Sequence, residues 1–496
     1  MIFRPSLLPA LGAAVLMLGV SGCWGGEDAP DAGRMVAGGA GVARLLREAD
    51  AAMGRGALPD AARLLDEARS LAPESPDLWV AIARLRLRGG EHLTALEAAD
   101  RALAFGPDHA PALHLRALMV RDAHGAADAL RWFEAARKAA PDNPDILADY
   151  AATLGDAGQA GAMLKVVRAL AEVAPDDARV PWLQAVLAAR GGEYGLARSL
   201  LTRSGMAARE VPAALLLDAL ISLEEGNADS AAATLEVLVA RQPANARARE
   251  LLARAMLAGG RHNDVIQRFG AEAMLPEASP YLVMLVARAH EARGDRAAAA
   301  PLLARAYGPM GGIAARLAVR DGLPPPTAEL RAALLAGKGA AARAQADALR
   351  QRFPASADVA SLAADALLGA GDRPAALAAY GLASEARRPW PLARRTIAAY
   401  RSAGNAEAAD LLLIRQVAGE TQTPSALVEL AQRLAQAGDW ARVAALLDHA
   451  IRLGAGHDPA LLGLRLRAAE ALGQQADARR FAALLAEVHP RTLAGR

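Results

Sequence analysis

Residues 76–107 read PDLWVAIARLRLRGGEHLTALEAADRALAFGP, and they contain the pattern that determines the fold. Pro76 follows a serine, and this pair favours a helix start because serine caps free N–H groups and proline suits the first helical turn. Gly90 favours a helix end, since glycine adopts the left-handed conformation at little cost. Ala95 and Ala102 lie seven residues apart and therefore share one face of a second helix. The stretch predicts two helices that are joined by a tight turn and packed through small side chains.

The same arrangement recurs at intervals of 34 residues, with slips of one residue in the C-terminal part. The predicted turns contain Gly56, Gly90, Gly158, Gly192, Gly226, Gly260, Gly294, Gly337, Gly371, Gly404, Gly438 and Gly473. The small residue five positions later is Ala61, Ala95, Ala129, Ala197, Ala231, Ala299, Ala342, Ala376, Ala409 or Ala478. Repetition at this period is typical of a solenoid. About thirteen units run from Val42 to about Arg491, so the sequence predicts an all-α fold.

The composition agrees with a helical array. Hydrophobic residues make up 53% of the 496 positions but aromatic residues only 4%, which leaves few bulky side chains for several separate globular cores. Alanine, leucine and arginine favour helices and strand-favouring residues are scarce, so the composition argues against an all-β fold. Cys23 is the only cysteine, which excludes an internal disulfide framework and cysteine-based zinc or iron–sulfur sites. The formal net charge of +2 gives no nucleic-acid signature.

The repeated pattern resembles the tetratricopeptide repeat (TPR) family. In the unit that begins at Pro76, the large residue at the fourth place is Trp79, the small residue at the eighth is Ala83, and the closing proline is Pro107. The resemblance implies a right-handed α-α superhelix of about 13 helix pairs. Units near Ala178, Ala246 and Trp390 lack several signature residues, including the closing proline.

One change of register divides the array. Between Ile313 and Leu323 the pattern gains nine residues, and three consecutive prolines follow, which forbid a continuing helix. We therefore expect a TPR array of about eight repeats over 42–313, an insertion or joint over 314–326, and about five repeats over 327–496. Whether the insertion is a joint between two segments or a tolerated surface loop is left open by the sequence.

The N-terminal segment reads as a targeting signal. Residues 1–22 combine a positive charge at Arg4 with an apolar run that is short for a membrane-spanning helix. The run ends in Val-Ser-Gly before Cys23, and this sequence resembles the bacterial lipobox. The resemblance implies a lipoprotein signal peptide and a mature N-terminus at Cys23 that carries acyl chains. The alternative is an ordinary secretory signal with an incidental cysteine.

The residues after Cys23 predict how the body is attached. Residues 23–41 are rich in glycine and poor in apolar side chains, so we expect a lipidated flexible tether. By resemblance to enteric lipoproteins, in which an aspartate after the cysteine favours retention in the inner membrane, Trp24 favours the outer membrane. The expected location is the bacterial cell envelope, with the body facing the periplasm.

Signatures of catalysis are absent from the sequence. It has no phosphate-binding G-x-x-x-x-G-K-[ST], no H-E-x-x-H and no G-x-S-x-G motif. The nine histidines are scattered through different units, so they predict no metal site. We therefore expect no enzyme, no cofactor and no metal. An enzyme would require a cluster of titratable groups that the linear pattern does not show.

Partner binding is the better prospect. The TPR resemblance places the second, fifth, ninth, twelfth and thirteenth residues of each unit on the concave surface. The candidate partner-binding residues at these places are Arg84, Arg88, Arg121, Trp182, Arg254, Tyr281, Arg288, Arg331, Arg394 and Arg467. Such a groove suits an acidic peptide, a C-terminal carboxylate or an anionic glycan. The alternative is a general protein-binding groove, because arginine is the commonest polar residue in this chain.

These patterns together predict a membrane-anchored periplasmic TPR scaffold for protein–protein interactions. Resemblance to TPR lipoproteins of the bacterial envelope implies a role in assembling a secretion or export system of the exopolysaccharide or pilus type. The alternatives are a solenoid that binds a glycan or peptide ligand, and a non-catalytic subunit of an outer-membrane assembly machine. The expected partners are envelope proteins or peptides in the groove, the membrane through the lipid anchor, and an anionic polymer as a further candidate. No nucleic-acid partner is expected.

Overall fold

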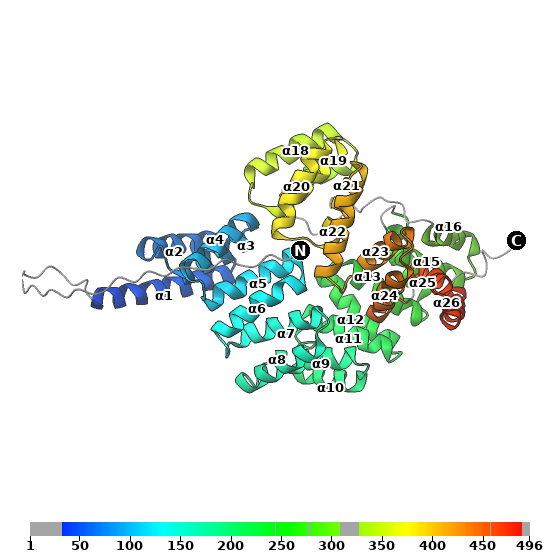
Figure 1. Cartoon of the computed structure of the whole chain (residues 1–496), viewed down its shortest axis with the longest axis horizontal. Helices are drawn as coiled ribbons and strands as arrows, with labels where there is room; N and C mark the ends of the chain where they lie inside the picture. The colour runs from blue at the N-terminus through cyan, green and yellow to red at the C-terminus, as the bar shows by residue number, and fades with distance from the viewer. Residues whose placement is uncertain (1–31, 244, 276–277, 308–326, 457, 489–496) are drawn as a thin grey trace, which may run out of the picture.

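The computed structural model describes residues 32–243, 245–275, 278–307, 327–456 and 458–488, and all regular structure within them is helical (Figure 1). Before residue 308 the helices are α1 (Ala32–Gly54), α2 (Leu58–Leu71), α3 (Pro76–Arg88), α4 (His92–Phe105), α5 (Ala110–His124), α6 (Ala126–Ala139), α7 (Pro144–Asp156), α8 (Ala160–Val173), α9 (Arg179–Arg190), α10 (Tyr194–Ser204), α11 (Pro212–Glu224), α12 (Ala228–Arg241), α13 (Ala246–Ala258), α14 (His262–Ala273), α15 (Pro280–Ala292) and α16 (Arg296–Tyr307). After residue 326 they are α17 (Ala328–Leu335), α18 (Gly339–Arg352), α19 (Ala357–Gly369), α20 (Arg373–Ala386), α21 (Trp390–Ser402), α22 (Ala406–Gly419), α23 (Pro424–Gln436), α24 (Trp440–Ala450), which continues into a π-helical turn, α25 (Pro459–Ala471) and α26 (Gln475–Val488).

The prediction of an all-α array of about thirteen helix pairs is confirmed by these thirteen described pairs. The Ser75 hydroxyl accepts a hydrogen bond from the N–H of Leu78 at 3.4 Å, as the predicted cap requires. In the turn that follows, Gly90 has a φ of +76°, which a residue with a Cβ adopts only with strain. The units near Ala178, Ala246 and Trp390 also form helix pairs, because each keeps its turn glycine.

Helix α1 corrects the predicted tether. It begins at Ala32, so residues 32–41 are helical and the flexible segment predicted over 23–41 overlaps the helix. Alanine, arginine and methionine favour helices, and each residue added to a formed helix gains a backbone hydrogen bond. Cys23 and the predicted insertion at 314–326 lie outside the described residues. No helix in the described part of the chain combines the length and apolar content that crossing a bilayer requires.

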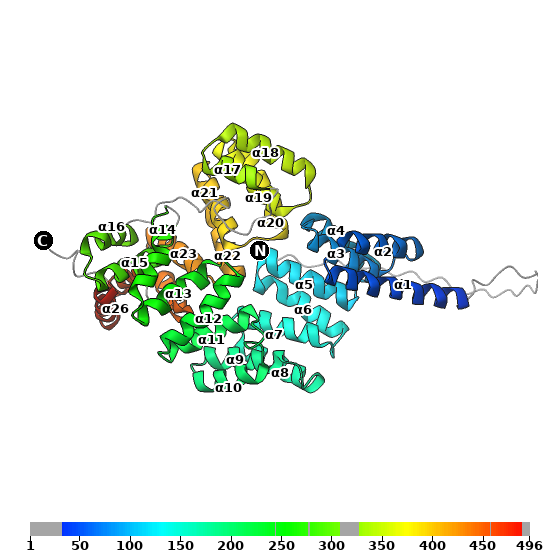
Figure 2. The ribbon, with the colours of Figure 1, turned by 180° about the vertical axis from the view of Figure 1, so that it is seen from behind.

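The helix pairs form two layers. Successive odd-numbered helices contact one another directly, for example α1 with α3, α7 with α9 and α13 with α15. Successive even-numbered helices do not make comparable contacts within the described chain. The array therefore curves with its odd-numbered helices on the inner, concave side and its even-numbered helices on the outer side (Figure 2).

The core explains why so few aromatic residues are sufficient. The repeated alanines, such as Ala61, Ala95 and Ala231, are fully buried and allow helices to approach closely. Larger side chains such as Phe133 and Phe269 fill the remaining space at intervals. Within the described residues the buried clusters follow one another from unit to unit, so the core extends along the array instead of gathering at one centre.

The array also contacts itself after one superhelical turn. Helix α20 contacts α4 and α5, and α22 contacts α6, as both ribbon views show (Figure 1, Figure 2). The N–H of Ala357 donates to Nδ1 of His92 at 3.3 Å. The Thr421 hydroxyl donates to the carbonyl of Asp156 at 3.3 Å. Both pairs are 265 residues apart, so about eight units separate the two edges that meet.

Candidate functional site

Half-exposed apolar side chains line the inner layer between α9 and α15. On α11, Leu216, Leu220 and Leu223 are spaced by four and three residues, so they share one face of the helix. Neighbouring Leu215 and Ala219 are buried in the core. We call the half-exposed set the apolar strip; it consists of Trp182, Val186, Leu216, Leu220, Leu223, Leu257 and Tyr281. The strip residues lie on α9, α11, α13 and α15, so this part of the concave surface is apolar over four consecutive units.

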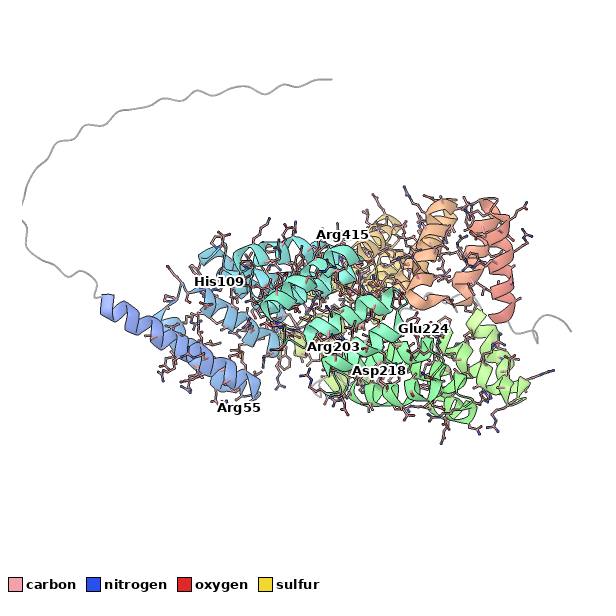
Figure 3. The ribbon with its side chains drawn as sticks, turned by 90° about the horizontal axis from the view of Figure 1, so that it is seen from below. Arg55, His109, Arg203, Asp218, Glu224 and Arg415 are labelled. Carbon is pink, nitrogen blue, oxygen red and sulfur yellow. The ribbon has the colours of Figure 1, made fainter. Side chains whose placement is uncertain are left out.

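Charged side chains of both signs accompany the strip. Arg254 on α13 lies 3.8 Å from Glu224 at the end of α11, and Figure 3 shows Glu224 and Asp218 on α11. On α15, Arg288 contacts Glu291 at 2.7 Å, one helical turn further on. Carboxylates of this chain therefore neutralise part of the arginine series, and the surface is apolar with paired charges rather than uniformly cationic.

Glu250 on α13 is a largely enclosed carboxyl group of this region. Its side chain is 17% exposed, and the Ser279 hydroxyl donates a hydrogen bond to it at 2.5 Å. Burial raises the pKa of Glu250, with only partial compensation from Ser279 and Arg247. Burial likewise raises the pKa of Tyr281 above its usual value. Burial therefore destabilises the charged form of each group relative to the same group in water.

The ten predicted binding residues extend from α3 to α25, and the structure does not bring them together into one site. Trp182 and Tyr281 lie in the apolar strip, and Arg254 and Arg288 are paired with carboxylates as described above. The guanidinium of Arg88 donates to the carbonyl of Met53 at 2.5 Å.

The remaining arginines differ in their surroundings. Arg394 lies 3.5 Å from Glu429, and Arg121 lies 3.9 Å from Asp122. Arg84 and Arg467 are exposed and make no ion pair with any described residue. Arg331 is half-buried on α17. These environments show no continuous cationic stripe over the described inner surface.

Sequence reasoning missed the residues that form most of this surface. The three leucines of α11 occupy the fifth, ninth and twelfth places of their unit, so the positional pattern that selected the arginines could have found them. The carboxylate partners carried a weaker signal, because Glu224 and Arg254 are separated by almost one unit. His114 occupies the inward fifth place of its unit, but its approach to Asp149 of the next unit, at 2.8 Å, was not predicted.

The described residues contain no group of three or more His, Cys, Asp or Glu side chains that could hold a metal ion. Two of the buried arginines belong instead to structural ion pairs. Arg395 on α21 binds Asp365 on α19, and Arg465 on α25 binds Asp448 and Asp477.

Comparisons with known proteins give only distant likenesses. No protein-family model matches the chain, and no curated protein matches it. The structure is similar to PilF of Pseudomonas aeruginosa, with a TM-score of 0.36 and 17% identity over 42% of this chain and 94% of that chain. It is similar to PilW, described as a widely conserved type IV pilus biogenesis factor, with a TM-score of 0.32 and 18% identity over 46% and 91%. It is also similar to human IFIT1, solved as a dimer with PPP-AAAA, with a TM-score of 0.39 and 18% identity over 68% and 83%.

The fold is that of a TPR solenoid. This assignment rests on the chain's own features, which are helix pairs of 34 residues, positive-φ turn glycines and a buried alanine series.

Proposed function

We propose that the protein is a non-catalytic TPR scaffold that binds an extended segment of a partner protein along its inner surface. The observation that carries this proposal is the apolar strip on α9, α11, α13 and α15. Contiguous half-exposed apolar side chains with polar residues at their edge are typical of protein interaction surfaces. The repeated, curved form of the array suits an extended partner, since neighbouring units present equivalent positions along its length.

The paired charges favour a protein partner over an anionic polymer. A polyanion gains affinity where several cations lack counter-ions, but Arg254 and Arg288 already contact Glu224 and Glu291. A polypeptide can place apolar side chains on the strip and polar groups on these pairs. The preferred ligand is therefore a segment with both apolar and charged residues.

We further propose that the scaffold is tethered to the bacterial envelope by lipidation of Cys23 and acts in assembly of an export or pilus system. Support for the anchor comes from the lipobox-like residues before Cys23. Tethering confines the array to a membrane surface and so raises its effective concentration toward partners there. The long array offers an extended partner a correspondingly long surface.

A photo-cross-linking experiment tests the inner surface. A photoreactive phenylalanine analogue at Leu220 should give a discrete cross-linked partner in envelope preparations. The same analogue at Leu411, which is 59% exposed on outer helix α22, should not give this product. Adding Leu216→Asp and Leu223→Asp should abolish the Leu220 product, because charges on the strip would be desolvated by the partner. Equal products from both positions would contradict the proposal.

The anchor has a separate test. Metabolic labelling with an alkyne-modified fatty acid should mark the full-length protein, and the Cys23→Ser variant should lose the label and leave the membrane fraction. Equal labelling of both forms would exclude lipidation of Cys23 without affecting the proposed role of the apolar strip.

A further inference from the structure

The self-contact of the array forms a partly open polar cavity of about 410 Å³. One side is formed by the turn between α5 and α6, including Arg121 and Gly125. The other side is formed by the turns that follow α20 and α22, including Arg387, Arg388 and Glu420. The cavity therefore exists only where two successive superhelical turns meet, and its volume suits a small organic ligand.

Arg388 is the buried cation of this cavity. The residue is 8% exposed, its backbone N–H donates to the carbonyl of Asp122 at 3.0 Å, and its Nε donates to Oε1 of Gln416 at 3.0 Å. The terminal nitrogens of the guanidinium make no hydrogen bond or ion pair with any described residue. Burial lowers the pKa of Arg388 and nearby Arg415 acts in the same direction, whereas the carboxylates Asp128 and Glu420 act in the opposite direction. The guanidinium nevertheless remains charged at neutral pH, because its reference pKa is far above 7.

The carboxylates of the cavity are already engaged elsewhere. Glu420 accepts a hydrogen bond from Nε2 of Gln416 at 2.7 Å. Asp156 lies 3.5 Å from Arg190, and Asp122 lies 3.9 Å from the Nε of Arg121. None of these carboxylates forms an ion pair with Arg388. Glu420 and Asp128 attract the Arg388 guanidinium only from beyond ion-pair distance. A buried cation without a directly bound counter-ion is costly, and a guanidinium with two free nitrogens matches the two oxygens of a carboxylate or phosphate group.

Backbone N–H groups at two helix N-termini also favour an anion in this cavity. Helix α6 begins at the cavity with Gly125 as its N-cap, and α21 begins there with Pro389 as its N-cap. Neither cap residue provides a side-chain hydrogen bond to the first N–H groups of its helix. Helix N-termini favour anions, because their free N–H groups and the helix dipole both carry partial positive charge.

We infer that this cavity binds a small organic anion through a carboxylate or phosphate group, with Arg388 as the principal ligand and Arg121 and Arg387 at its walls. Arg121 belongs to the third unit and Arg388 follows the tenth, so a bound anion connects two superhelical turns. The site is separate from the apolar strip, and the anion stabilises the closed form of the solenoid by binding both edges.

Calorimetric titration of the full chain tests the inference, with citrate as the carboxylate probe and inorganic phosphate as the phosphate probe at fixed ionic strength. At least one probe should bind with a Kd below about 1 mM and raise the unfolding temperature. Binding of citrate alone assigns the site to carboxylates, and binding of phosphate alone assigns it to phosphates. Failure of both probes to bind overturns the inference.

Two variants locate the site. Arg388→Met, which keeps an unbranched chain as far as the position of Nε, should weaken binding at least about tenfold, because it removes the buried charge. Arg350→Met changes an exposed arginine of α18 and should leave binding unchanged. If Arg388→Met fails to fold, Arg121→Met takes its place and should weaken binding severalfold. Unchanged affinity in a folded Arg388→Met protein, or in Arg121→Met where that variant replaces it, would overturn the assignment.

Discussion

At the scale of single residues, Glu250 makes stability depend on pH. Its folded-state pKa lies above the reference value of 4.5 because the carboxyl group is buried. The folded protein therefore holds the proton of Glu250 more tightly than the unfolded chain does. The resulting contribution to the free energy of unfolding is complete below pH 4.5 and is lost as pH rises through the folded-state pKa. Glu250→Gln should raise the unfolding temperature at pH 7.5, and the difference from the unmodified protein should vanish near pH 4.

The control for this pH dependence is Glu67→Gln, which changes an exposed glutamate of α2. Thermal unfolding followed by circular dichroism should show no pH-dependent difference for this variant. A Glu250→Gln protein that is less stable at pH 7.5 than the unmodified protein would show that the contacts of the ionised carboxylate outweigh its burial.

The buried ion pair between Asp365 and Arg395 gives a second prediction at this scale. Both side chains are 4% exposed, the Arg395 Nε lies 3.0 Å from Asp365 Oδ1, and the Tyr380 hydroxyl donates to the same oxygen at 2.5 Å. Asp365→Ala should cost about 3–5 kcal/mol, because it leaves Arg395 charged and buried. Combining Asp365→Leu with Arg395→Met should recover most of that loss in urea unfolding. A double variant as unstable as the single one would contradict this explanation.

The structural roles of some residues could be predicted from the sequence, and those of others could not. Turn glycines and core alanines were predictable, because each follows from local backbone geometry repeated in register. Arg388 was not predictable as a cavity residue, since its surroundings come from Asp122 and other residues about eight units away. The carboxylate partners of Arg254 and Arg288 fall between these cases, because they lie within one unit of the arginine.

At the scale of helices and turns, two glycines should respond in opposite ways to the same substitution. Gly226 joins α11 to α12 with a φ of +78°, and an added Cβ would meet no neighbour within 4 Å. Gly226→Ala should therefore cost about 1–2 kcal/mol through backbone strain alone. Gly270 lies inside α14, also with free space, and Gly270→Ala should stabilise by about 0.5–1 kcal/mol. Unfolding temperatures of both variants test this contrast, and equal signs would contradict it.

The helix pairs that lack signature residues show why the fold class could be predicted from imperfect repeats. The unit of α13 and α14 has Glu277 at the place where the pattern puts the closing proline, yet Asn245 caps α13 by accepting from the N–H of Ala248 at 3.1 Å. Gly260 keeps its left-handed turn. A unit needs only its caps, its turn and buried small residues, because the neighbouring units supply the rest of its packing.

At the scale of the whole molecule, the self-contact depends on a property that no single unit reveals. The pitch of a solenoid is the sum of small rotations between successive units, so a change of a few degrees in each accumulates over the eight units of one turn. The sequence therefore predicted the period, but it could not predict that the turn before α21 would meet the turn after α5. The polar cavity between Arg121 and Arg388 results from this accumulated geometry, so the sequence could not predict it either.

The closest approach in the self-contact provides its test. Gly419 at the end of α22 faces His124, and a Cβ at residue 419 would overlap the backbone carbonyl of His124. The backbone fixes the position of a Cβ, and the carbonyl of His124 is itself a backbone group, so no side-chain rotation can relieve the overlap. Gly419→Ala should therefore separate the two superhelical turns. The radius of gyration from X-ray scattering should increase, and the N–H of Arg388 should lose protection from hydrogen exchange when its bond to Asp122 breaks.

Gly369→Ala, at the end of α19 with no neighbour within 4 Å, should change neither measurement. Helix content should remain unchanged in both variants, because each helix pair is packed mainly against its neighbours in sequence. A Gly419→Ala protein with unchanged dimensions and protection would show that the turns are not held together at this point.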